Sequence, residues 1–542
     1  MMNTNVPSRS SFLPLLTIFL CQWYCSTVSA YVNVKSAVPA PRALEFLKQI
    51  TGEIIESPTL TDAMIADSHR IMKGWSTTAT RTTSKENAVA VENLVKRLVD
   101  EVVLAGNVKA SPTTNDYNCM LESWARSGEG TFAAERCEQI LTQMQTEYET
   151  GNAPQIQPDL GSFKIVLQAW KHAGGKSLSS FRAQRILDWM NSLYKNGKND
   201  LALPDQMCFD TVLQSWARNN HEQAPIYAES LLSNMETLSQ TEYISVVQPR
   251  TLSYNAVLGA WGCASLALSS SPSSFSSKPS TTSWQRSCDI LHFMEKSYFV
   301  EGNKRLEPDR VSYSLVLKTL ARHKDDARAA PKADKILKSI EKNVKSGDLS
   351  WKPETLLFNT VMGCWARSQR KGTYRKTRSI LDRQLNYFSS LKGKTGGENC
   401  RPDVYGFTTV LSSCATESGD KKEKLKAFNV AVSTYKELIK NSEEYGAPNH
   451  VTYGTMLKCV TKLLPHNSKE RLRWAKEIFR EAVENGSVGE MVLSRLREVG
   501  SAKDYKHLMQ GYNKGTLPED WTRNVKEKNQ YRRKVSAKRA EV

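Results

Sequence analysis

Positively charged side chains recur at one position in a series of related segments of this chain. Each stands nine residues after a recurrent aromatic residue, and the eight positions hold Arg126, His172, Arg218, Cys263, Arg322, Arg367, Thr416 and Lys462. Six of the eight can carry or share a positive charge, as a row of side chains that follows phosphate groups would require. The same side chains could instead stabilise the negative end of a helix dipole, so both interpretations remain open.

The overall charge of the chain agrees with a polyanionic partner. The 542 residues include 74 Lys and Arg against 56 Asp and Glu, which gives a net charge of +18. Such an excess favours nucleic acid first and an anionic membrane surface second, although it can also serve only to keep a large protein soluble. No segment approaches the roughly 20 apolar residues that a membrane span needs, so we expect no membrane contact in the mature form.

The sequence carries no pattern typical of a catalytic or metal-binding site. The eleven Cys include Cys21 and Cys25 near the N-terminus, and the other nine form no Cys-x-x-Cys pair and no zinc-finger spacing with His. There is no His-x-Glu with a downstream Cys pair for zinc deamination, and no cluster of Asp after the repeats for metal-dependent cleavage. We therefore expect no enzyme activity and no cofactor. The scattered Cys also suit a reducing compartment.

A sequence repeat must position these side chains. Eight segments share a Pro, an aromatic residue five residues later, an apolar residue four further on and, in most copies, a Trp three beyond that. They begin at Pro112, Pro158, Pro204, Pro249, Pro308, Pro353, Pro402 and Pro448. Their aromatic residues are Tyr117, Phe163, Phe209, Tyr254, Tyr313, Phe358, Phe407 and Tyr453. The interval is 45 to 49 residues, with one of 59, which indicates a fixed structural repeat.

The spacing of these residues predicts helical hairpins. The i, i+4, i+7 spacing of the aromatic, apolar and Trp residues places them on one face of a helix, and the Pro suits its start. A second apolar-periodic stretch follows each first one, from residues 134–144 in the first full copy to 472–483 in the last. With a weaker copy around Ile71, Met72 and Trp75, about nine hairpins fill residues 65–486. Because one hairpin cannot bury its apolar faces alone, we predict an all-α fold, an α-solenoid of stacked helix–turn–helix repeats with the Trp row in its core.

The segments outside the repeats are assigned from composition. Residues 269–283 are rich in Ser and predict a loop inside the longest interval. Residues 487–516 predict one or two C-terminal helices, and residues 517–542 predict a basic tail.

The N-terminus resembles a targeting sequence. Residues 12–20 form a short apolar run and residues 28–30 fit a small-residue cleavage site, so residues 1–30 are assigned as a signal segment. Residues 31–64 are assigned as a transit region and linker, with Lys35 and Arg42 before the first acid at Glu45. The arrangement is similar to the two-part targeting sequence of algae with complex plastids, with Tyr31 where that motif has Phe. We expect an organelle, a plastid rather than a mitochondrion; a secretory signal is the alternative.

The first-helix pattern resembles the pentatricopeptide repeat, in the Trp-rich form seen in algal members. The best copies run from Tyr117 to Arg126 and from Phe358 to Arg367, in the order aromatic, Asn, any residue, two apolar residues, two of any type, Trp, Ala and Arg. The resemblance spans roughly residues 65–486 and implies a right-handed superhelix. The usual unit of the family is shorter, and the extra length here falls in the second helix and its exit loop.

The resemblance implies single-stranded RNA binding, with one base per repeat contacted by two side chains. The first side chain follows the aromatic residue, where this chain has Asn118, Lys164, Asp210, Asn255, Ser314, Asn359, Thr408 and Gly454. The second follows the Pro of the next repeat, where it has Asp159, Asp205, Arg250, Asp309, Glu354, Asp403 and Asn449. In the family Asn with Asp favours uracil and Thr with Asn favours adenine, so the implied target is 5′-U-n-n-U-n-U-A-3′.

The second set has another explanation that does not involve RNA. Asp or Asn directly before a helix is also what an N-cap requires, because its side chain accepts bonds from free backbone N–H groups. Arg250 departs from that explanation and Glu354 fits it poorly. Both roles can coexist at the other positions.

Two more sets of positions support RNA binding. In the cationic row, the residues expected to contact phosphates are Arg126, Arg218, Arg322, Arg367 and Lys462. The residue two before each aromatic wedges between bases in the family, and the later repeats have Met207, Leu252, Val311, Leu356, Tyr405 and Val451 there. Asn115 and Gly161 replace it in the first two full repeats, where base capture should be weaker.

The predicted function is sequence-selective RNA binding that acts in the stability, processing or translation of organellar RNA. We expect a monomer, with organellar RNA-processing or ribosomal proteins as further partners. The rival function is a protein-binding scaffold of the tetratricopeptide type, which is also built from hairpins but of about 34 residues. The Pro-Asp junctions and the cationic row speak against a scaffold.

Overall fold

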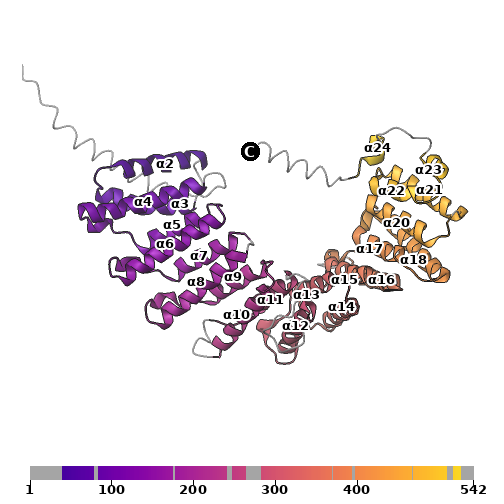
Figure 1. Cartoon of the computed structure of the whole chain (residues 1–542), viewed down its shortest axis with the longest axis horizontal. Helices are drawn as coiled ribbons and strands as arrows, with labels where there is room; N and C mark the ends of the chain where they lie inside the picture. The colour runs from indigo at the N-terminus through magenta and orange to yellow at the C-terminus, as the bar shows by residue number, and fades with distance from the viewer. Residues whose placement is uncertain are drawn as a thin grey trace, which may run out of the picture. The chain divides into compact units, whose positions relative to one another are not determined.

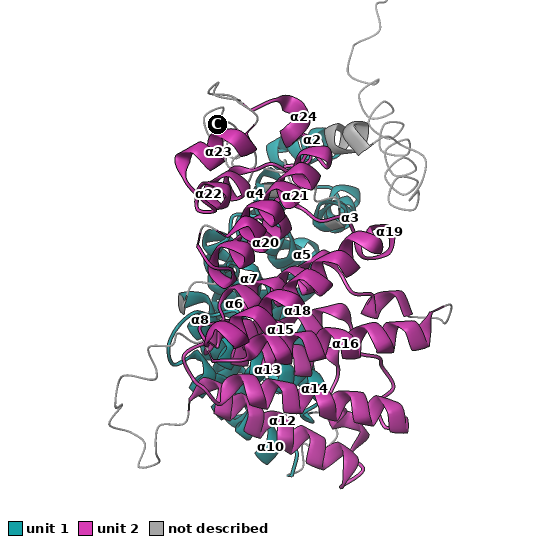
Figure 2. Ribbon diagram, turned by 90° about the vertical axis from the view of Figure 1, so that its right-hand side faces the viewer, with its two compact units in different colours: residues 1–265 teal, residues 266–542 magenta. Residues whose placement is uncertain are grey.

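The computed structural model describes residues 40–77, 84–174, 177–240, 247–263, 282–368, 370–392, 397–466, 468–509 and 517–525. Over these residues the chain consists of helices joined by short turns, without a strand (Figure 1). The chain divides into two compact units, residues 1–265 and 266–542 (Figure 2). The division falls in the longest interval of the sequence repeat.

Unit 1 alternates two kinds of helix. The first helices carry the recurrent aromatic residue or its equivalent: α3 (Asp62–Thr77), α5 (Thr114–Ala125), α7 (Leu160–His172), α9 (Gln206–Ala217) and α11 (Thr251–Cys263). The second helices are α4 (Ser84–Ala105), α6 (Thr131–Glu149), α8 (Ser177–Lys195) and α10 (Ala224–Leu238). Helix α2 (Ala40–Glu56) precedes them, and the 3-10 turns η1 (Val108–Ala110), η2 (Pro154–Ile156) and η3 (Asp200–Ala202) follow α4, α6 and α8.

Unit 2 continues the same alternation. Its first helices are α13 (Arg310–Arg322), α15 (Thr355–Arg367), α17 (Val404–Ala415) and α20 (His450–Leu463), with α22 (Glu490–Arg497) in the corresponding place at the end. Its second helices are α12 (Ser283–Phe299), α14 (Ala329–Ser346), α16 (Thr373–Leu391), α18 (Lys421–Lys440) and α21 (Lys469–Glu484). The short elements are η5 (Lys304–Leu306), η6 (Gly397–Cys400), α19 (Ser442–Tyr445), α23 (Ala502–Leu508) and α24 (Glu519–Thr522).

Packing between neighbours makes each unit a stack of two layers. Each first helix contacts the preceding first helix of its unit, where there is one, and it also contacts the second helices of the same unit that adjoin it in the chain. The predicted second-helix stretches all lie inside observed second helices. The prediction of an all-α, solenoid-like repeat fold is therefore confirmed, while the right-handed superhelix stays a prediction.

Helix α7 shows how the repeat sequence produces a first helix. Asp159 precedes it with an extended backbone, and its carboxylate accepts a hydrogen bond from the Ser162 N–H at 2.8 Å. This N-cap supplies a partner for a backbone donor that the helix itself leaves free. The i, i+4, i+7 residues Phe163, Leu167 and Trp170 are all fully buried, so the predicted face is the one that packs.

The Trp row is part of the core, as predicted. Trp75, Trp124, Trp170, Trp216 and Trp365 are buried. Three Trp indoles also donate a hydrogen bond to the preceding second helix, at a constant separation of 32 residues: Trp124 to Glu92, Trp216 to Gln184 and Trp261 to Glu229. The indole therefore joins the two layers through both its apolar surface and its N–H group.

The N-terminal boundary of the array is earlier than the sequence prediction. Residues 31–64 were assigned to a transit region and linker, but residues 40–56 form α2, which packs on α3 and α4. Leu47, Ile50 and Ile54 are buried, and Thr51 accepts a hydrogen bond from the Trp75 indole at 2.9 Å. Helix α3 also starts at Asp62 rather than at residue 65. The apolar residues of α2 cover a first hairpin that would otherwise expose its outer side.

The start of the predicted basic tail is also folded. Helix α24 packs on α21, where the Trp521 ring meets the Phe479 ring at 5.7 Å. The Val488 N–H donates to the Trp521 carbonyl, and the Asn524 N–H donates to the Gly486 carbonyl, both at 2.8 Å. The predicted C-terminal helices of residues 487–516 correspond to α22 and α23.

Several assignments fall on residues outside the described ranges. They are the signal segment 1–30, the transit region up to residue 39, most of the Ser-rich loop 269–283, and the tail from residue 526 onward. Within the described residues, no helix is long and apolar enough to cross a membrane. Cys364 and Cys459 are buried in the core.

Replacement of Trp170 tests the contribution of the Trp row. Its indole N–H has no hydrogen-bond partner, so Trp170→Ala removes packing alone. We expect the free energy of unfolding to fall by about 3 kcal/mol or more, which urea denaturation followed by circular dichroism would measure. Met207→Ala is the control, because that side chain is 50% exposed and its loss should change stability by less than about 0.5 kcal/mol. Equal losses in the two variants would contradict the proposed core.

Candidate nucleic-acid interface

The predicted RNA-contacting positions lie along one side of each first helix. On α5 they are Asn115, Asn118 and Arg126, with Glu122 between the last two. Steps of three, four and four residues return to nearly the same direction on a helix with 3.6 residues per turn. The same offsets recur on the other first helices, and the buried aromatic, apolar and Trp residues occupy the adjoining side. We call this line of positions the stripe.

In unit 1, three predicted pairs join neighbouring first helices. Asn118 on α5 donates from Nδ2 to Asp159 at 3.3 Å. Lys164 on α7 forms an ion pair with Asp205 at 2.6 Å. The predicted partners therefore meet across each junction, although their chemistry differs from one repeat to the next. We call these contacts junction pairs.

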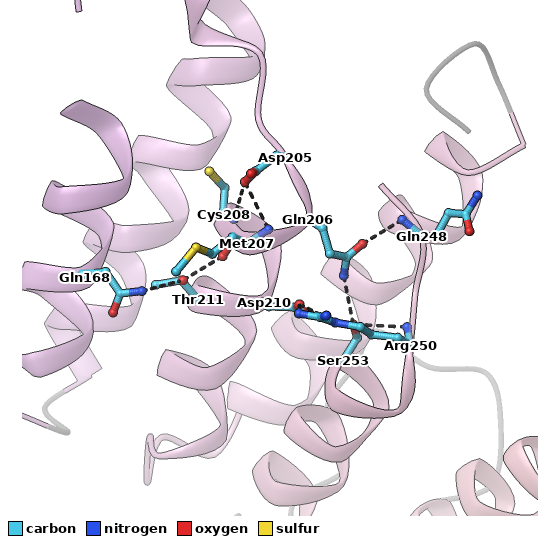
Figure 3. Close-up of polar contacts among 10 residues, drawn as sticks. All are labelled: Gln168, Asp205, Gln206, Met207, Cys208, Asp210, Thr211, Gln248, Arg250 and Ser253. Atoms are coloured by element: carbon cyan, nitrogen blue, oxygen red, sulfur yellow. Dashed lines mark hydrogen bonds and ion pairs between the residues drawn. The ribbon is translucent and has the colours of Figure 1, made fainter. Parts of the chain in front are cut away.

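The third junction pair of unit 1 contains a deeply buried carboxylate (Figure 3). Arg250 donates from Nη2 and Nε to one oxygen of Asp210, at 2.6 and 3.0 Å. The other oxygen of Asp210 accepts from the Ser253 hydroxyl at 2.7 Å. The Asp210 side chain is only 4% exposed, whereas that of Arg250 is 50% exposed. Both oxygens of this carboxylate are thus occupied by protein donors.

In unit 2, two predicted pairs meet and one does not. Asn359 on α15 donates from Nδ2 to the two carboxylate oxygens of Asp403, at 3.0 and 3.2 Å. Thr408 on α17 reaches Asn449 through the Thr452 hydroxyl, with oxygen–oxygen distances of 2.9 and 3.3 Å.

Two predicted pairs remain, at Ser314 with Glu354 and at Asn255 with Asp309. Instead of pairing with Ser314 as predicted, Glu354 forms an ion pair with Arg310 at the start of α13. Asn255 lies on α11 in unit 1, and Asp309 precedes α13 in unit 2.

The second residue of most pairs is also an N-cap, as the alternative explanation required. Asp159, Asp205, Asp309, Asp403 and Asn449 each accept a hydrogen bond from the backbone of the helix that follows. Glu354 occupies the cap position without a side-chain cap bond. Capping therefore explains these residue types without RNA, and it also fixes the carboxylate or amide where it faces the first residue of the pair.

A hydroxyl that supports several pairs was missed by the sequence reasoning. The residue before the aromatic is Ser162 in α7, and its hydroxyl donates to Asn118 Oδ1 at 2.6 Å. Ser253 and Thr452 take the same place for Asp210 and Thr408. Gly406 has no such hydroxyl, and Oδ1 of Asn359 is buried there without a partner. The recurrent Ser or Thr directly before the aromatic was the signal available in the sequence.

A further pair extends the series before Asn118. His69 on α3 follows Ser68, which stands where the other first helices have their aromatic residue. The Nδ1 atom of His69 lies 2.7 Å from Oδ1 of Asp116 on α5. The hydrogen bond to Asp116 raises the pKa of His69, and burial opposes this effect. Sequence reasoning missed the pair because Ser68 obscures the repeat there.

The predicted wedge positions are exposed apolar side chains. Their exposed fractions range from 42% to 58% for Met207, Leu252, Val311, Leu356 and Tyr405, and Val451 is half-buried. Met491 on α22 holds the equivalent place and is also exposed. Its side chain fills the space beside Gly454, where an added Cβ would lie 2.6 Å from Cγ of Met491. An apolar row thus runs beside the junction pairs in each unit.

The cationic row lies at the C-terminal ends of the first helices. Arg126, Arg218, Arg322, Arg367 and Lys462 are all exposed. Arg126 donates to the Ser76 carbonyl at 2.8 Å, and Arg367 donates to the Ala321 carbonyl at 3.4 Å. These two side chains therefore bind the end of the preceding first helix, as the helix-dipole interpretation required, and their exposed surface leaves contact with an anion open.

Positively charged side chains at the ends of α7 and α9 repel one another. Burial, and then the charges of Lys171 and Arg218, lower the pKa of His172. Burial and the charge of Arg218 lower the pKa of Lys171 as well. A phosphate bound among these three side chains would relieve their mutual repulsion.

No group of three or more His, Cys, Asp or Glu side chains that could hold a metal ion occurs among the described residues. No family model matches this chain, and no curated protein is significantly similar to it in sequence.

The two ion-paired junctions of unit 1 should differ in their effect on stability. Arg250→Ala leaves the buried Asp210 carboxylate with one donor, so the free energy of unfolding should fall by about 1–3 kcal/mol. Lys164→Ala should cost less than about 1 kcal/mol, because Asp205 is 29% exposed and remains hydrated. Urea denaturation of both variants measures the difference, and the reverse order would contradict the assigned burial.

Proposed function

We propose that this chain binds single-stranded RNA along the stripe of its first helices, in the manner of pentatricopeptide repeats. One observation carries the proposal: the junction pairs, the apolar row and the cationic row share that stripe in each unit. Hydrogen-bonding groups for base edges, apolar side chains for base faces and cations for phosphates are the three components that single-strand recognition needs.

The neutral junction pairs have hydrogen-bonding capacity left for a base. An Asn side chain carries two N–H donors and an acceptor oxygen. Asn118 uses one donor for Asp159 and its oxygen for Ser162, so the second donor remains available. Among the junctions inside one unit, the neutral pairs at Asn118, Asn359 and Thr408 are therefore the ones proposed to select bases.

The ion-paired junctions contribute less to base choice. Lys164 with Asp205, and Arg250 with Asp210, satisfy each other inside the protein. A base that approached them would have to compete with a charge-assisted bond. These repeats accept any nucleotide, which agrees with the unassigned second and third positions of the target 5′-U-n-n-U-n-U-A-3′.

The biological role that follows is passive. The bound chain shields a short unpaired stretch of organellar RNA from nucleases and competing structure, or exposes a neighbouring site to a ribosome or processing enzyme. The plastid is the proposed location. Catalysis, a metal and a cofactor have no part in this mechanism.

Protein binding is the second candidate, because the apolar row could also receive apolar side chains of a peptide. The discriminating experiment is selection of the full chain against randomised single-stranded RNA, followed by sequencing. Enrichment of U-n-n-U-n-U-A, in competition with duplex RNA, supports RNA binding. Weak binding without sequence preference would favour the peptide-binding scaffold.

The cationic row can be tested without disturbing the helix ends. Arg218→Glu with Arg322→Glu spares Arg126 and Arg367, which bind backbone carbonyls. The double variant should bind all RNA sequences more weakly, and the slope of log affinity against log salt should fall by about 0.7 for each lost phosphate contact. Filter binding over a salt series measures both, and an unchanged slope would remove these residues from the interface.

Lys164→Asn tests whether the junction pairs select bases. The substitution gives the second full repeat an Asn opposite Asp205, the same combination as Asn118 with Asp159. The variant should acquire a preference for uracil at the second position of the target, which selection and sequencing would reveal. Lys164→Ala removes the same charge and should acquire no preference. A uracil preference in both variants, or in neither, would contradict the assignment.

A further inference from the structure

His69 occupies the stripe of α3 at the place of the first junction residues, because it follows the position of the recurrent aromatic residue. Its partner Asp116 lies on α5, 47 residues further along the chain. Asp116 stands directly before Tyr117, so it takes the place that Ser162, rather than Asp159, has beside Asn118. The His69 side chain is 32% exposed, and that of Asp116 is 1% exposed.

The bonds of Asp116 determine which nitrogen of His69 carries the proton. Oδ2 of Asp116 accepts from the Thr113 N–H at 2.8 Å and from the Thr113 hydroxyl at 2.7 Å. Oδ1 is then left for Nδ1 of His69. Because a carboxylate can only accept, Nδ1 must be the protonated nitrogen of the neutral ring. Nε2 therefore carries a lone pair when His69 is neutral and a hydrogen when it is charged.

The charged groups around His69 are engaged elsewhere. On α3 itself, Asp67 and Arg70 pair with each other at 3.3 Å. Lys109 of η1 pairs with Asp62 at 2.7 Å. On α4, Arg97 pairs with Glu101 at 2.9 Å, and Lys48 of α2 pairs with Glu86 of α4 at 2.7 Å. Asp116 is thus the charged group on the packed elements that bonds His69, and Lys73 is an exposed cation one turn along α3.

We propose that His69 is a further RNA-contacting residue, whose Nε2 bonds the base on the 5′ side of the uracil at Asn118 and changes from acceptor to donor as the pH falls. The inference rests on the proposed RNA binding. Nε2 has no protein hydrogen bond among the described residues, and the ring is one-third exposed on the stripe. This residue adds one base contact to the array, and the hydrogen-bonding role of Nε2 in that contact depends on pH.

The change of state occurs in an accessible pH range. The hydrogen bond to Asp116 raises the pKa of His69 above its ordinary value near 6.5, against the effect of burial. The ring therefore keeps its proton to a higher pH than an ordinary imidazole, so it is charged at pH 5.5 and loses the charge as the pH rises. The charged ring adds a charge-assisted donor beside a polyanion, so RNA binding should strengthen as the pH falls.

The experiment isolates the base contact from all phosphate contacts. The full chain is titrated with two RNAs, U-n-n-U-n-U-A extended by one 5′ nucleotide that either carries a base or is abasic. The ratio of the two affinities is measured at pH 5.5 and 8.5, for each of the four bases. For at least one base we expect the ratio to be about fivefold larger at pH 5.5, the usual gain from a charged donor.

Substitutions assign the effect to His69. His69→Asn can still bond Asp116 but does not titrate, so its ratio should be the same at both pH values, and His69→Gln provides a second test if that variant is unstable. His292→Asn, on the second helix α12, should behave like the unsubstituted chain. A ratio of one at both pH values, or a pH dependence that persists in His69→Asn, would overturn the inference alone. Failure of the unsubstituted chain to bind any of the RNAs would overturn RNA binding itself.

Discussion

The burial of one apolar face on each first helix is the constraint on which the rest of the structure depends. Phe163, Leu167 and Trp170 of α7 are fully buried between the two layers, and the equivalent residues of other first helices are buried in the same way. Because this face fixes the rotation of the helix about its own axis, it also fixes which side chains point along the stripe. The positions along the stripe are therefore set by buried core residues that take no part in the proposed contacts.

Helix capping and the proposed RNA contact fall on the same residues in this fold. Asp159 must accept a backbone N–H of α7 to stabilise the helix, and this bond holds its carboxylate beside Asn118. Arg250 stands at the position of these cap residues, but its side chain donates to the buried Asp210 instead. The repeats thus differ in chemistry while they keep the same backbone, since each junction needs only some pair of complementary polar groups.

Much of this arrangement follows from the sequence because the repeat supplies eight observations of one local structure. The periodic aromatic, apolar and Trp residues predict the hairpins, and Asp before each helix predicts the caps. The features that the sequence did not predict lie where the repeat pattern is interrupted. Most of them depend on contacts between residues more than 40 positions apart. Ser68 conceals the place of His69, Glu354 pairs with Arg310 rather than Ser314, and α2 directly follows a stretch that resembles a targeting sequence.

Met491 has a consequence for how the interface ends. Helix α22 begins like another first helix, and its Met491 side chain fills the space next to Gly454, so residue 454 has no room for a polar side chain. The series of junction pairs therefore ends with Thr408. On the proposed function, this close contact limits how many nucleotides the array can recognise.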